Sequence, residues 1–415
     1  MLSRRMLLAL PFAPLALRAS DAFYLRANDR VVFYGDSITD QRLYTTFVET
    51  FAVTRFPKMP VSFTHSGWGG DRVTGGGGGN LETRLKRDVF DHWPTVFTSM
   101  LGMNDGRYRA YDPALFDEFA QGSARIVDQV RAKFPDCRIT LIRPSTYDDI
   151  TRPPLFEGGY NAVLIRYGDY LAQLAAERHC DVADLNALLA KTLKVANAEN
   201  PTLAQRLLPD RVHPTPSGHL ILAQALLDAW RAPSLVSSTV LDTNPRNVLA
   251  TENTNVTDMA VEDSVSWNQL DWALPMPLDL RDPVLDLAQK ASGFIPRFNR
   301  HLLTVHGLAA GQWQLTIDRQ AVAKFSAADF QGGVNLGAYD TPMGRQARRV
   351  HELTLKRTRI KNARWRELQV PLEAESLDTR PATMAQMDEL ALELERKQRA
   401  AAQPVEHVFK LEKVS

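Results

Sequence analysis

The sequence lacks several features that would place it in a class at once. It has two cysteines in 415 residues, and their spacing does not resemble that of a metal site. A formal net charge of +1 argues against nucleic acid as the main partner. Beyond the N-terminus, no stretch is apolar over enough residues to span a bilayer. The hydrophobic fraction of 44% is ordinary for a globular protein, so the chain can bury a sizeable core.

Cofactor motifs are missing as well. A run of glycines occupies residues 75–79, but no Lys-Ser/Thr pair follows it as in a phosphate-binding loop, and no dinucleotide fingerprint is present. We interpret the run as a flexible or left-handed segment. No His, Asp or Glu cluster has the spacing of metal ligands. We therefore expect neither a cofactor nor a metal ion.

The two cysteines, Cys137 and Cys180, each lie near the start of a candidate strand, at residues 138–142 and 181–183. If those strands are neighbours, an exported protein could oxidise the pair to a disulfide. The alternative is two buried, unreactive thiols. The sequence leaves both interpretations open.

The first residues have the pattern of an export signal. An arginine pair, Arg4-Arg5, is followed by apolar residues to Leu17 and then by small residues. This pattern predicts a signal peptide over residues 1–22 and a periplasmic or secreted protein. The arginine pair also fits a twin-arginine signal, although an ordinary basic n-region explains it equally well.

From residue 30 to residue 231, candidate strands alternate with helical stretches. Such alternation predicts a parallel sheet with helices on both faces and right-handed crossovers. We expect a three-layer α/β/α sandwich around a five-stranded parallel sheet, of flavodoxin-like type. The strands are expected at 30–34, 60–66, 95–101, 138–143 and 181–184, and the helices near 41–54, 80–90, 113–133, 160–178 and 216–230.

Past residue 232 the pattern changes. Residues 235–275 are rich in Thr, Asn, Asp and Val, and residues 301–325 look like antiparallel strands. Two charged helices follow, near 342–366 and 384–402. Their charges are typical of solvated helix faces, and a patch for an anionic polymer is the alternative. The predicted organisation is a signal peptide (1–22), a catalytic domain (23–235), an appended mixed α/β region (236–350) and a helical charged tail (351–415).

The first strand ends in a cluster of residues that can carry chemistry. Its apolar run stops at Gly35-Asp36-Ser37, beside the start of a helix. In open α/β sheets, reactive groups lie just past the carboxyl ends of the strands. Taken alone, Gly-Asp-Ser also fits an ordinary helix-capping loop.

Three further motifs follow in order along the chain: Gly70-Asp71, Gly102-x-Asn104-Asp105 and Asp210-x-x-His213. The first two come after the second and third strands. The third comes just before the last helix, which opens with a capping hydroxyl and a proline, Thr215-Pro216. Together with the Gly-Asp-Ser cluster, these motifs make roughly residues 30–231 resemble the SGNH (GDSL-type) hydrolase superfamily.

The residues of these motifs can form a serine triad. A serine hydroxyl needs a base to accept its proton, and an imidazole base needs a carboxylate to fix its tautomer. Ser37, His213 and Asp210 fit these roles, and the Asp-x-x-His spacing puts the acid and the base on one loop. The chain order Ser, Asp, His occurs here without a Gly-x-Ser-x-Gly elbow.

The resemblance implies three oxyanion donors, namely the backbone N–H groups of Ser37 and Gly70 and the side-chain amide of Asn104. Gly69 is an alternative to Gly70, and we choose Gly70 because it directly precedes Asp71. The purely structural alternatives are a turn glycine and an Asx-turn asparagine. The acidic neighbours are assigned to loop scaffolding: Asp36, Asp71 and Asp105.

These residues predict an exported serine esterase that hydrolyses carboxylic esters through an acyl-enzyme. Exported bacterial members of the superfamily commonly resemble carbohydrate O-deacetylases, so we expect a small-molecule or polysaccharide ester as partner and an O-acetylated glycan as substrate. An esterase or lipase acting on aryl or short-chain acyl esters and an O-acyltransferase are the alternatives. A non-catalytic glycan-binding protein on the same scaffold is disfavoured, because Ser37, His213 and Asn104 are all present.

The appended region contains two tryptophans, Trp267 and Trp272, whose flat faces could stack on sugar rings. The corresponding hypothesis is that residues 236–350 pack on the catalytic domain and shape its substrate entrance. Aromatic side chains bury large areas in the core of a small domain, and core packing is the interpretation we favour for both.

Overall fold

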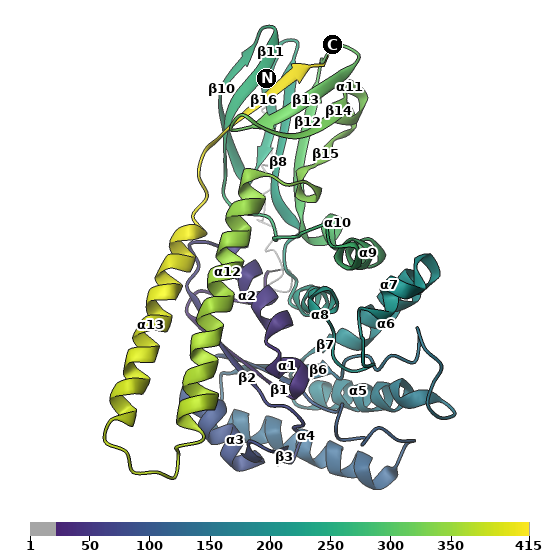
Figure 1. Cartoon of the computed structure of the whole chain (residues 1–415), viewed down its shortest axis with the longest axis vertical. Helices are drawn as coiled ribbons and strands as arrows, with labels where there is room; N and C mark the ends of the chain where they lie inside the picture. The colour runs from purple at the N-terminus through teal and green to yellow at the C-terminus, as the bar shows by residue number, and fades with distance from the viewer. Residues whose placement is uncertain (1–21, 415) are drawn as a thin grey trace, which may run out of the picture.

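A five-stranded parallel sheet forms the core of the first half of the chain, with the strand order β2-β1-β5-β6-β7. The computed structural model describes residues 22–414 (Figure 1), so the predicted signal peptide lies outside the described residues apart from Ala22. The predicted α/β fold class is confirmed. The five strands are β1 Asp29–Gly35, β2 Val61–Gly67, β5 Val96–Met100, β6 Arg138–Arg143 and β7 Asp181–Asp184.

The register of the sheet brings the sequence motifs together. Gly35 at the end of β1 is paired with Gly67 of β2 and with Met100 of β5. The loops that carry the predicted nucleophile and oxyanion donors therefore leave the same edge of the sheet, at the carboxyl ends of adjacent strands. We call this edge the catalytic edge.

Helices cover the sheet and form two groups. In one group α8 packs against α2 and α6, and in the other α4 packs against α3 and α5. The helix α8 begins at Pro216 as predicted, but the Thr215 hydroxyl donates to the Arg206 carbonyl (3.1 Å) and does not cap the helix. The helices are α2 Leu43–Arg55, α3 Leu81–Asp88, α4 Pro113–Lys133, α5 Gly159–Glu177, α6 Leu185–Glu199 and α8 Pro216–Ala229.

The second half of the chain begins with a β-sandwich. One sheet has the order β10-β11-β16-β13-β14 and the other the order β15-β12-β8-β9. Inward residues alternate along β11 and β13, so apolar side chains such as Trp267 and Leu315 fill the core between the sheets. The strands are β8 Leu235–Thr243, β9 Arg246–Glu252, β10 Thr254–Val261, β11 Ser264–Asp271, β12 Arg300–His306, β13 Gln312–Ile317, β14 Gln320–Ser326, β15 Val334–Asn335 and β16 His407–Lys413.

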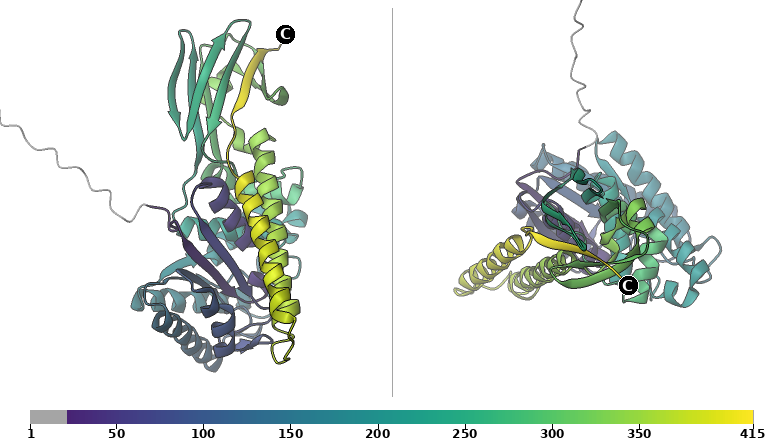
Figure 2. Two further views of the ribbon diagram at one scale, coloured as in Figure 1. Left: turned by 90° about the vertical axis from the view of Figure 1, so that its left-hand side faces the viewer. Right: turned by 90° about the horizontal axis from the view of Figure 1, so that it is seen from above.

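Two long helices, α12 (Pro342–Ala363) and α13 (Arg380–Ala401), form a hairpin between β15 and β16. The hairpin leaves the sandwich and runs along the α/β domain, where α12 packs against α2 (Figures 1 and 2). A π-helical turn, η3 (Arg364–Gln369), follows α12 at the far end of the hairpin. The charge run of α12 is not a uniformly solvated face as predicted, because Arg357 is fully buried.

The predicted division at residue 350 differs from the structure. That residue falls inside α12, and the segment predicted as a helical tail ends in β16, which lies between β11 and β13. The reason is that β16 has its partners far back in the sequence, so no local pattern assigns it to the sandwich.

The sandwich adjoins the end of α2 that lies away from the catalytic edge. Arg55, the last residue of α2, donates to the carbonyls of Pro233 (3.0 Å) and Leu235 (2.6 Å), where the sandwich begins. Since α2 has 13 residues and starts beside the catalytic edge, roughly 20 Å separates the two ends. The hypothesis that residues 236–350 shape the catalytic cleft therefore finds no support in the packing.

The two tryptophans of the sandwich have different environments. Trp267 is buried against Phe409, with ring centroids 5.2 Å apart, as expected for a core residue. Trp272 is 56% exposed and lines an apolar groove with Phe56 and Met59, at the junction of the sandwich and the α/β domain. The core interpretation therefore holds for Trp267 but not for Trp272.

Cys137 and Cys180 are both free thiols, so the disulfide that the sequence left open does not form in this structure. Within residues 22–414, every helix is too short or too polar to cross a membrane.

Candidate active site

Ser37, His213 and Asp210 form a connected chain of hydrogen bonds at the catalytic edge. The Ser37 hydroxyl lies 2.8 Å from His213 Nε2, and His213 Nδ1 lies 2.7 Å from Asp210 Oδ2. Ser37 begins the short helix α1 (Ser37–Asp40), and the other two residues share the loop before α8. The structure thus brings together the three residues predicted as the triad, from segments 176 residues apart.

The local sequence explains why Ser37 is held at this point. Asp36 caps α1 by accepting the Ile38 N–H (3.0 Å). Gly35 is required where β1 meets the helix, because a Cβ there would lie 2.3 Å from Thr39 Oγ1 and 2.7 Å from the Met100 carbonyl. The turn is therefore tight, and it presents Ser37 at the carboxyl end of β1.

The loop that carries the base is fixed by its own carboxylate. Asp210 Oδ1 accepts the backbone N–H groups of Val212 (3.0 Å) and His213 (2.7 Å). Burial opposes ionisation of Asp210, but these hydrogen bonds and the contact with the His213 ring lower its pKa below the ordinary value. An ionised Asp210 can hold the ring in the tautomer that leaves Nε2 free to accept the Ser37 proton.

A second histidine, His219, lies close behind the triad but serves the structure. Its Nδ1 accepts the Tyr44 N–H (3.3 Å) and its Nε2 lies 2.6 Å from Gln41 Oε1. Burial lowers the pKa of His219 to about 3, with a further contribution from His213. With its charged form disfavoured by burial and both ring nitrogens hydrogen-bonded, His219 supports α2 and α8 and leaves His213 as the base.

The predicted oxyanion donors lie at the ends of β1, β2 and β5. As the first residue of α1, Ser37 has a backbone N–H without an intrahelical acceptor. Gly70 has a φ of +77°, which favours glycine. Gly69 donates its N–H to Asp40 Oδ2 (3.2 Å), so Gly70 is the better donor candidate of the pair.

The Asn104 carboxamide is oriented by two contacts. Its Nδ2 donates to the Asp71 carbonyl (3.0 Å), and its Oδ1 accepts the Tyr108 hydroxyl (2.9 Å). Because an amide nitrogen carries two hydrogens, one N–H remains available for an oxyanion. Sequence reasoning missed Tyr108, because the residue belongs to none of the motifs and lies in a turn without a regular spacing.

The three aspartates assigned to scaffolding make structural contacts. Asp36 caps α1, Asp105 accepts the Val73 N–H (2.9 Å), and Asp71 accepts the Arg84 Nε–H (2.7 Å). Burial raises the pKa of Asp36 to about 8 and that of Asp105 to about 7. Such contacts hold the loops around the triad in place.

The triad opens into a groove of about 700 Å³ lined by Ser37, His213 and Asp210. Asp40 and Arg42 line this groove and also a second pocket of about 360 Å³. The wall of the second pocket comes partly from the helical hairpin, through Asn362, Arg366, Glu367, Val370 and Pro371. Sequence reasoning missed these hairpin residues, because nothing local links them to the triad.

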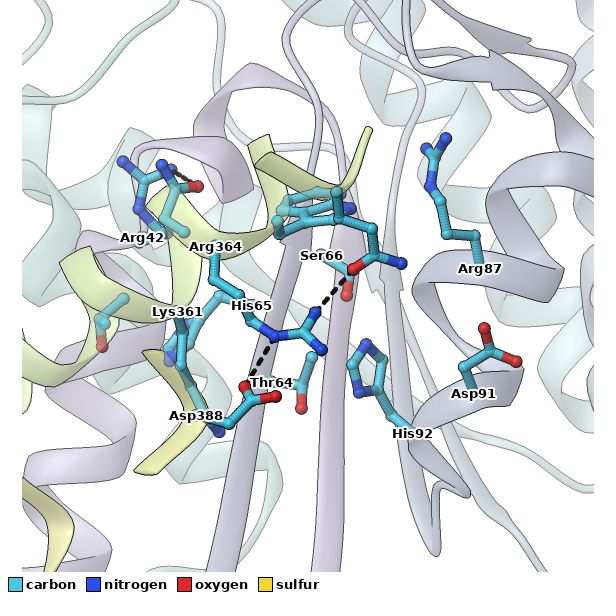
Figure 3. Close-up of a pocket in the computed structure, with 14 residues that line it drawn as sticks. Arg42, Thr64, His65, Ser66, Arg87, Asp91, His92, Lys361, Arg364 and Asp388 are labelled. Atoms are coloured by element: carbon cyan, nitrogen blue, oxygen red, sulfur yellow. Dashed lines mark hydrogen bonds and ion pairs between the residues drawn. The ribbon is translucent and has the colours of Figure 1, made fainter. Parts of the chain in front are cut away.

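A separate cavity of about 360 Å³ lies at the interface between the hairpin and β2 (Figure 3). Within it, Arg364 contacts Asp388 and Gln369 of its own hairpin, both at 2.7 Å. Lys361 donates to the Phe63 carbonyl of β2 (3.3 Å), and burial lowers the pKa of this lysine to about 8. The Lys361 hydrogen bond thus joins the hairpin to β2 at this point.

Comparison with known proteins identifies the relatives of this chain. Residues 33–221 match the model of the GDSL-like Lipase/Acylhydrolase family. An acetylxylan esterase of Geobacillus stearothermophilus is 25% identical over 224 residues, which cover 48% of this chain and 93% of that protein. A solved structure of a gut microbial diltiazem-metabolizing enzyme is 25% identical, with a TM-score of 0.80 over 95% of this chain and 99% of that one. The α/β domain therefore belongs to the SGNH (GDSL-type) hydrolase superfamily, and the protein is an ester hydrolase of this type.

The structural similarity extends beyond the family region. The diltiazem-metabolizing enzyme matches nearly the whole chain, so the α/β domain, the β-sandwich and the helical hairpin recur together in a solved structure. The acetylxylan esterase covers about half of the chain.

Proposed function

We propose that the protein is an exported serine esterase that removes O-acetyl groups from a carbohydrate. The observation that carries the proposal is the hydrogen-bonded chain of Ser37, His213 and Asp210, which faces an open groove. Export is proposed from the N-terminal pattern of Arg4-Arg5 and the apolar run that follows.

The geometry supports an acyl-enzyme mechanism. His213 Nε2 takes the Ser37 proton as Oγ attacks the ester carbonyl, and the Ser37 N–H, the Gly70 N–H and the Asn104 amide receive the resulting oxyanion. His213 then gives the proton to the departing alcohol, and the acyl group stays on Ser37. Water, deprotonated by His213, attacks the acyl-enzyme in the same way and releases the carboxylic acid.

Two observations favour a carbohydrate as the alcohol. The groove beside Ser37 adjoins a second pocket through Asp40 and Arg42, and that pocket adds the polar side chains of Asn362 and Arg366. Hydroxyl-rich sugars need such hydrogen-bonding groups on the leaving-group side. The similarity to an acetylxylan esterase points the same way.

The similarity to the diltiazem-metabolizing enzyme favours a second candidate function, an esterase acting on small aryl or short-chain esters. An O-acyltransferase uses the same acyl-enzyme, with a sugar hydroxyl in place of water.

The test is acetate release from acetylated xylan, pectin, sialic acid and peptidoglycan, with p-nitrophenyl acetate and diltiazem as small esters. Ser37→Ala serves as the matched inactive control. The proposal expects kcat/KM on one acetylated glycan to exceed that on the small esters. Turnover of the small esters alone would establish the second candidate. Acetyl groups that appear on an added sugar acceptor, without release as acetate, would identify a transferase.

Export has its own test. The full chain expressed in a bacterium should lose its first residues and appear in the periplasm or the medium. Replacement of Arg4-Arg5 by Lys-Lys should block this if the twin-arginine interpretation holds, and an unprocessed cytoplasmic product of the wild type would contradict export.

A further inference from the structure

The far end of the helical hairpin lies against the loop that carries Gly70. We call residues 68–71, between β2 and the glycine run, the oxyanion loop. The indole of Trp365 in η3 meets that of Trp68 edge to face, with ring centroids 5.5 Å apart. Single π-helical turns occur frequently at functional sites. In the sequence, almost 300 residues separate η3 from the loop that it contacts.

A first set of contacts runs through Arg366 and Asp40. The Arg366 guanidinium lies 3.5 Å from the centre of the Trp68 ring and within 3.3 Å of both Asp40 carboxylate oxygens. Asp40 Oδ2 in turn accepts the Gly69 N–H (3.2 Å). Arg366 therefore contacts the loop at Trp68 directly and at Gly69 through Asp40, and both residues precede Gly70.

A second set of contacts reaches the other side of Gly70. Trp365 Nε1 donates to Asp88 Oδ1 (2.7 Å), and Asp88 pairs with Arg84. Arg84 Nε donates to the Asp71 carboxylate (2.7 Å), while the Asp71 carbonyl accepts the Asn104 amide (3.0 Å). Buried ionic networks tolerate few arrangements, because each unpaired charge in them costs several kcal/mol.

The oxyanion loop needs such external support. Gly69 and Gly70 are exposed, and a Cβ on Gly70 would meet no atom within 4 Å, so the loop packs loosely around this residue. Glycine has the largest backbone freedom of any residue. A donor that must point at one position in the transition state cannot depend on such a segment alone.

We propose that the far end of the helical hairpin contributes to the active site, and that Trp365 and Arg366 act as positioning residues for the oxyanion hole. They hold the oxyanion loop from both sides, so that the Gly70 N–H and the Asn104 amide stay directed at the reacting carbonyl. The proposal rests on the proposed serine esterase function and on the oxyanion donors assigned above.

The test uses the full chain, p-nitrophenyl acetate and two variants, Trp365→Phe and Arg366→Ala. Trp365→Phe keeps the aromatic ring but removes the donor to Asp88. We expect kcat to fall about ten- to a hundredfold in each variant, the scale of a small misplacement of catalytic groups. KM should change less than about twofold, because the lost stabilisation belongs to the transition state. Replacement of the exposed Arg359 in the preceding helix, α12, by Ala is the matched control and should keep the wild-type rate.

Counting the active sites separates positioning from folding. A fluorophosphonate that labels Ser37 gives the fraction of molecules with a competent triad, and kcat is expressed per labelled site. A lowered kcat per site supports the proposal, whereas an unchanged kcat per site in both variants overturns it. A loss confined to KM on an acetylated glycan also overturns it, since Arg366 would then only bind substrate. If the wild type hydrolyses none of the esters, the proposed function itself has failed.

Discussion

Arg357 of the hairpin and Glu49 of α2 form a two-pronged ion pair in the protein interior, although 308 residues separate them in sequence. Arg357 Nη2 lies 2.6 Å from each Glu49 oxygen, and both side chains are 1% exposed. His65, Gln398 and Glu395 complete the cluster around the pair. This contact joins the hairpin to the α/β domain at the middle of α12.

The first prediction concerns the stability of this junction. Arg357→Ala should lower the free energy of unfolding by about 3–5 kcal/mol, because it leaves the Glu49 charge buried without its partner. Replacement of both members by apolar residues, Arg357→Met with Glu49→Leu, should cost less than either single change. Urea unfolding monitored by circular dichroism measures the difference, and a single variant with wild-type stability would contradict the argument.

The second prediction is an acid sensitivity with a defined direction. Burial raises the pKa of Glu49, but attraction to Arg357 and hydrogen bonds from its neighbours lower it to about 2 from the ordinary 4.5. A depressed carboxyl pKa contributes stability that is fully present above pH 4.5 and is lost as the pH falls through 2. The difference in thermal unfolding between the wild type and Glu49→Gln should therefore shrink across this range. A difference that stays constant with pH would show that the pKa of Glu49 is the same in the folded and the unfolded protein, which would contradict the argument.

The third prediction tests the triad. Ser37→Ala should reduce kcat by roughly three or more decades, the scale for loss of a serine nucleophile, and should leave the unfolding temperature unchanged. Asp210→Asn should lower kcat about 10³- to 10⁴-fold, because it favours the wrong His213 tautomer. Activity should also fall in acid, because a protonated His213 cannot accept the Ser37 proton. Near-normal turnover in Ser37→Ala would contradict the mechanism.

The fourth prediction separates the Asn104 amide from the residue that orients it. Asn104→Ala should lower kcat about a hundred- to a thousandfold with little change in KM, as for the loss of one oxyanion donor. Tyr108→Phe removes only a hydrogen bond to Asn104 Oδ1. Its loss should lower kcat by about tenfold or less. Steady-state kinetics on p-nitrophenyl acetate tests both. Equal losses in the two variants would mean that Tyr108 contacts the substrate itself.

The parts of the fold and of the site that the sequence predicts are those with a local signal. A buried parallel strand is a short apolar run ended by a glycine, and the motifs around Ser37 and Asn104 directly follow such runs. The Asp-x-x-His spacing likewise places Asp210 and His213 on one loop. The sequence therefore suffices to predict the strand positions and the triad residues.

The hairpin had no such signal. Arg357 and Arg366 belong to a basic helix whose composition is typical of a solvated surface, and their partners, Glu49 and Asp40, lie in the first fifty residues. Only the packing of α12 against α2 brings these charges together. In the same way, no local pattern distinguishes the buried Trp267 from the exposed Trp272, because the exposure of each depends on partners distant in sequence.

The return of the chain into the sandwich also has a consequence for biosynthesis. Domains generally fold in order as the chain emerges from the ribosome, and the α/β domain is complete long before His407–Lys413 are made. Until β16 is made, β11 and β13 each lack a partner strand on one side. Each then has an exposed edge that can pair with other chains. A stop codon only a few residues early would thus release an enzyme with an intact triad and an aggregation-prone sheet.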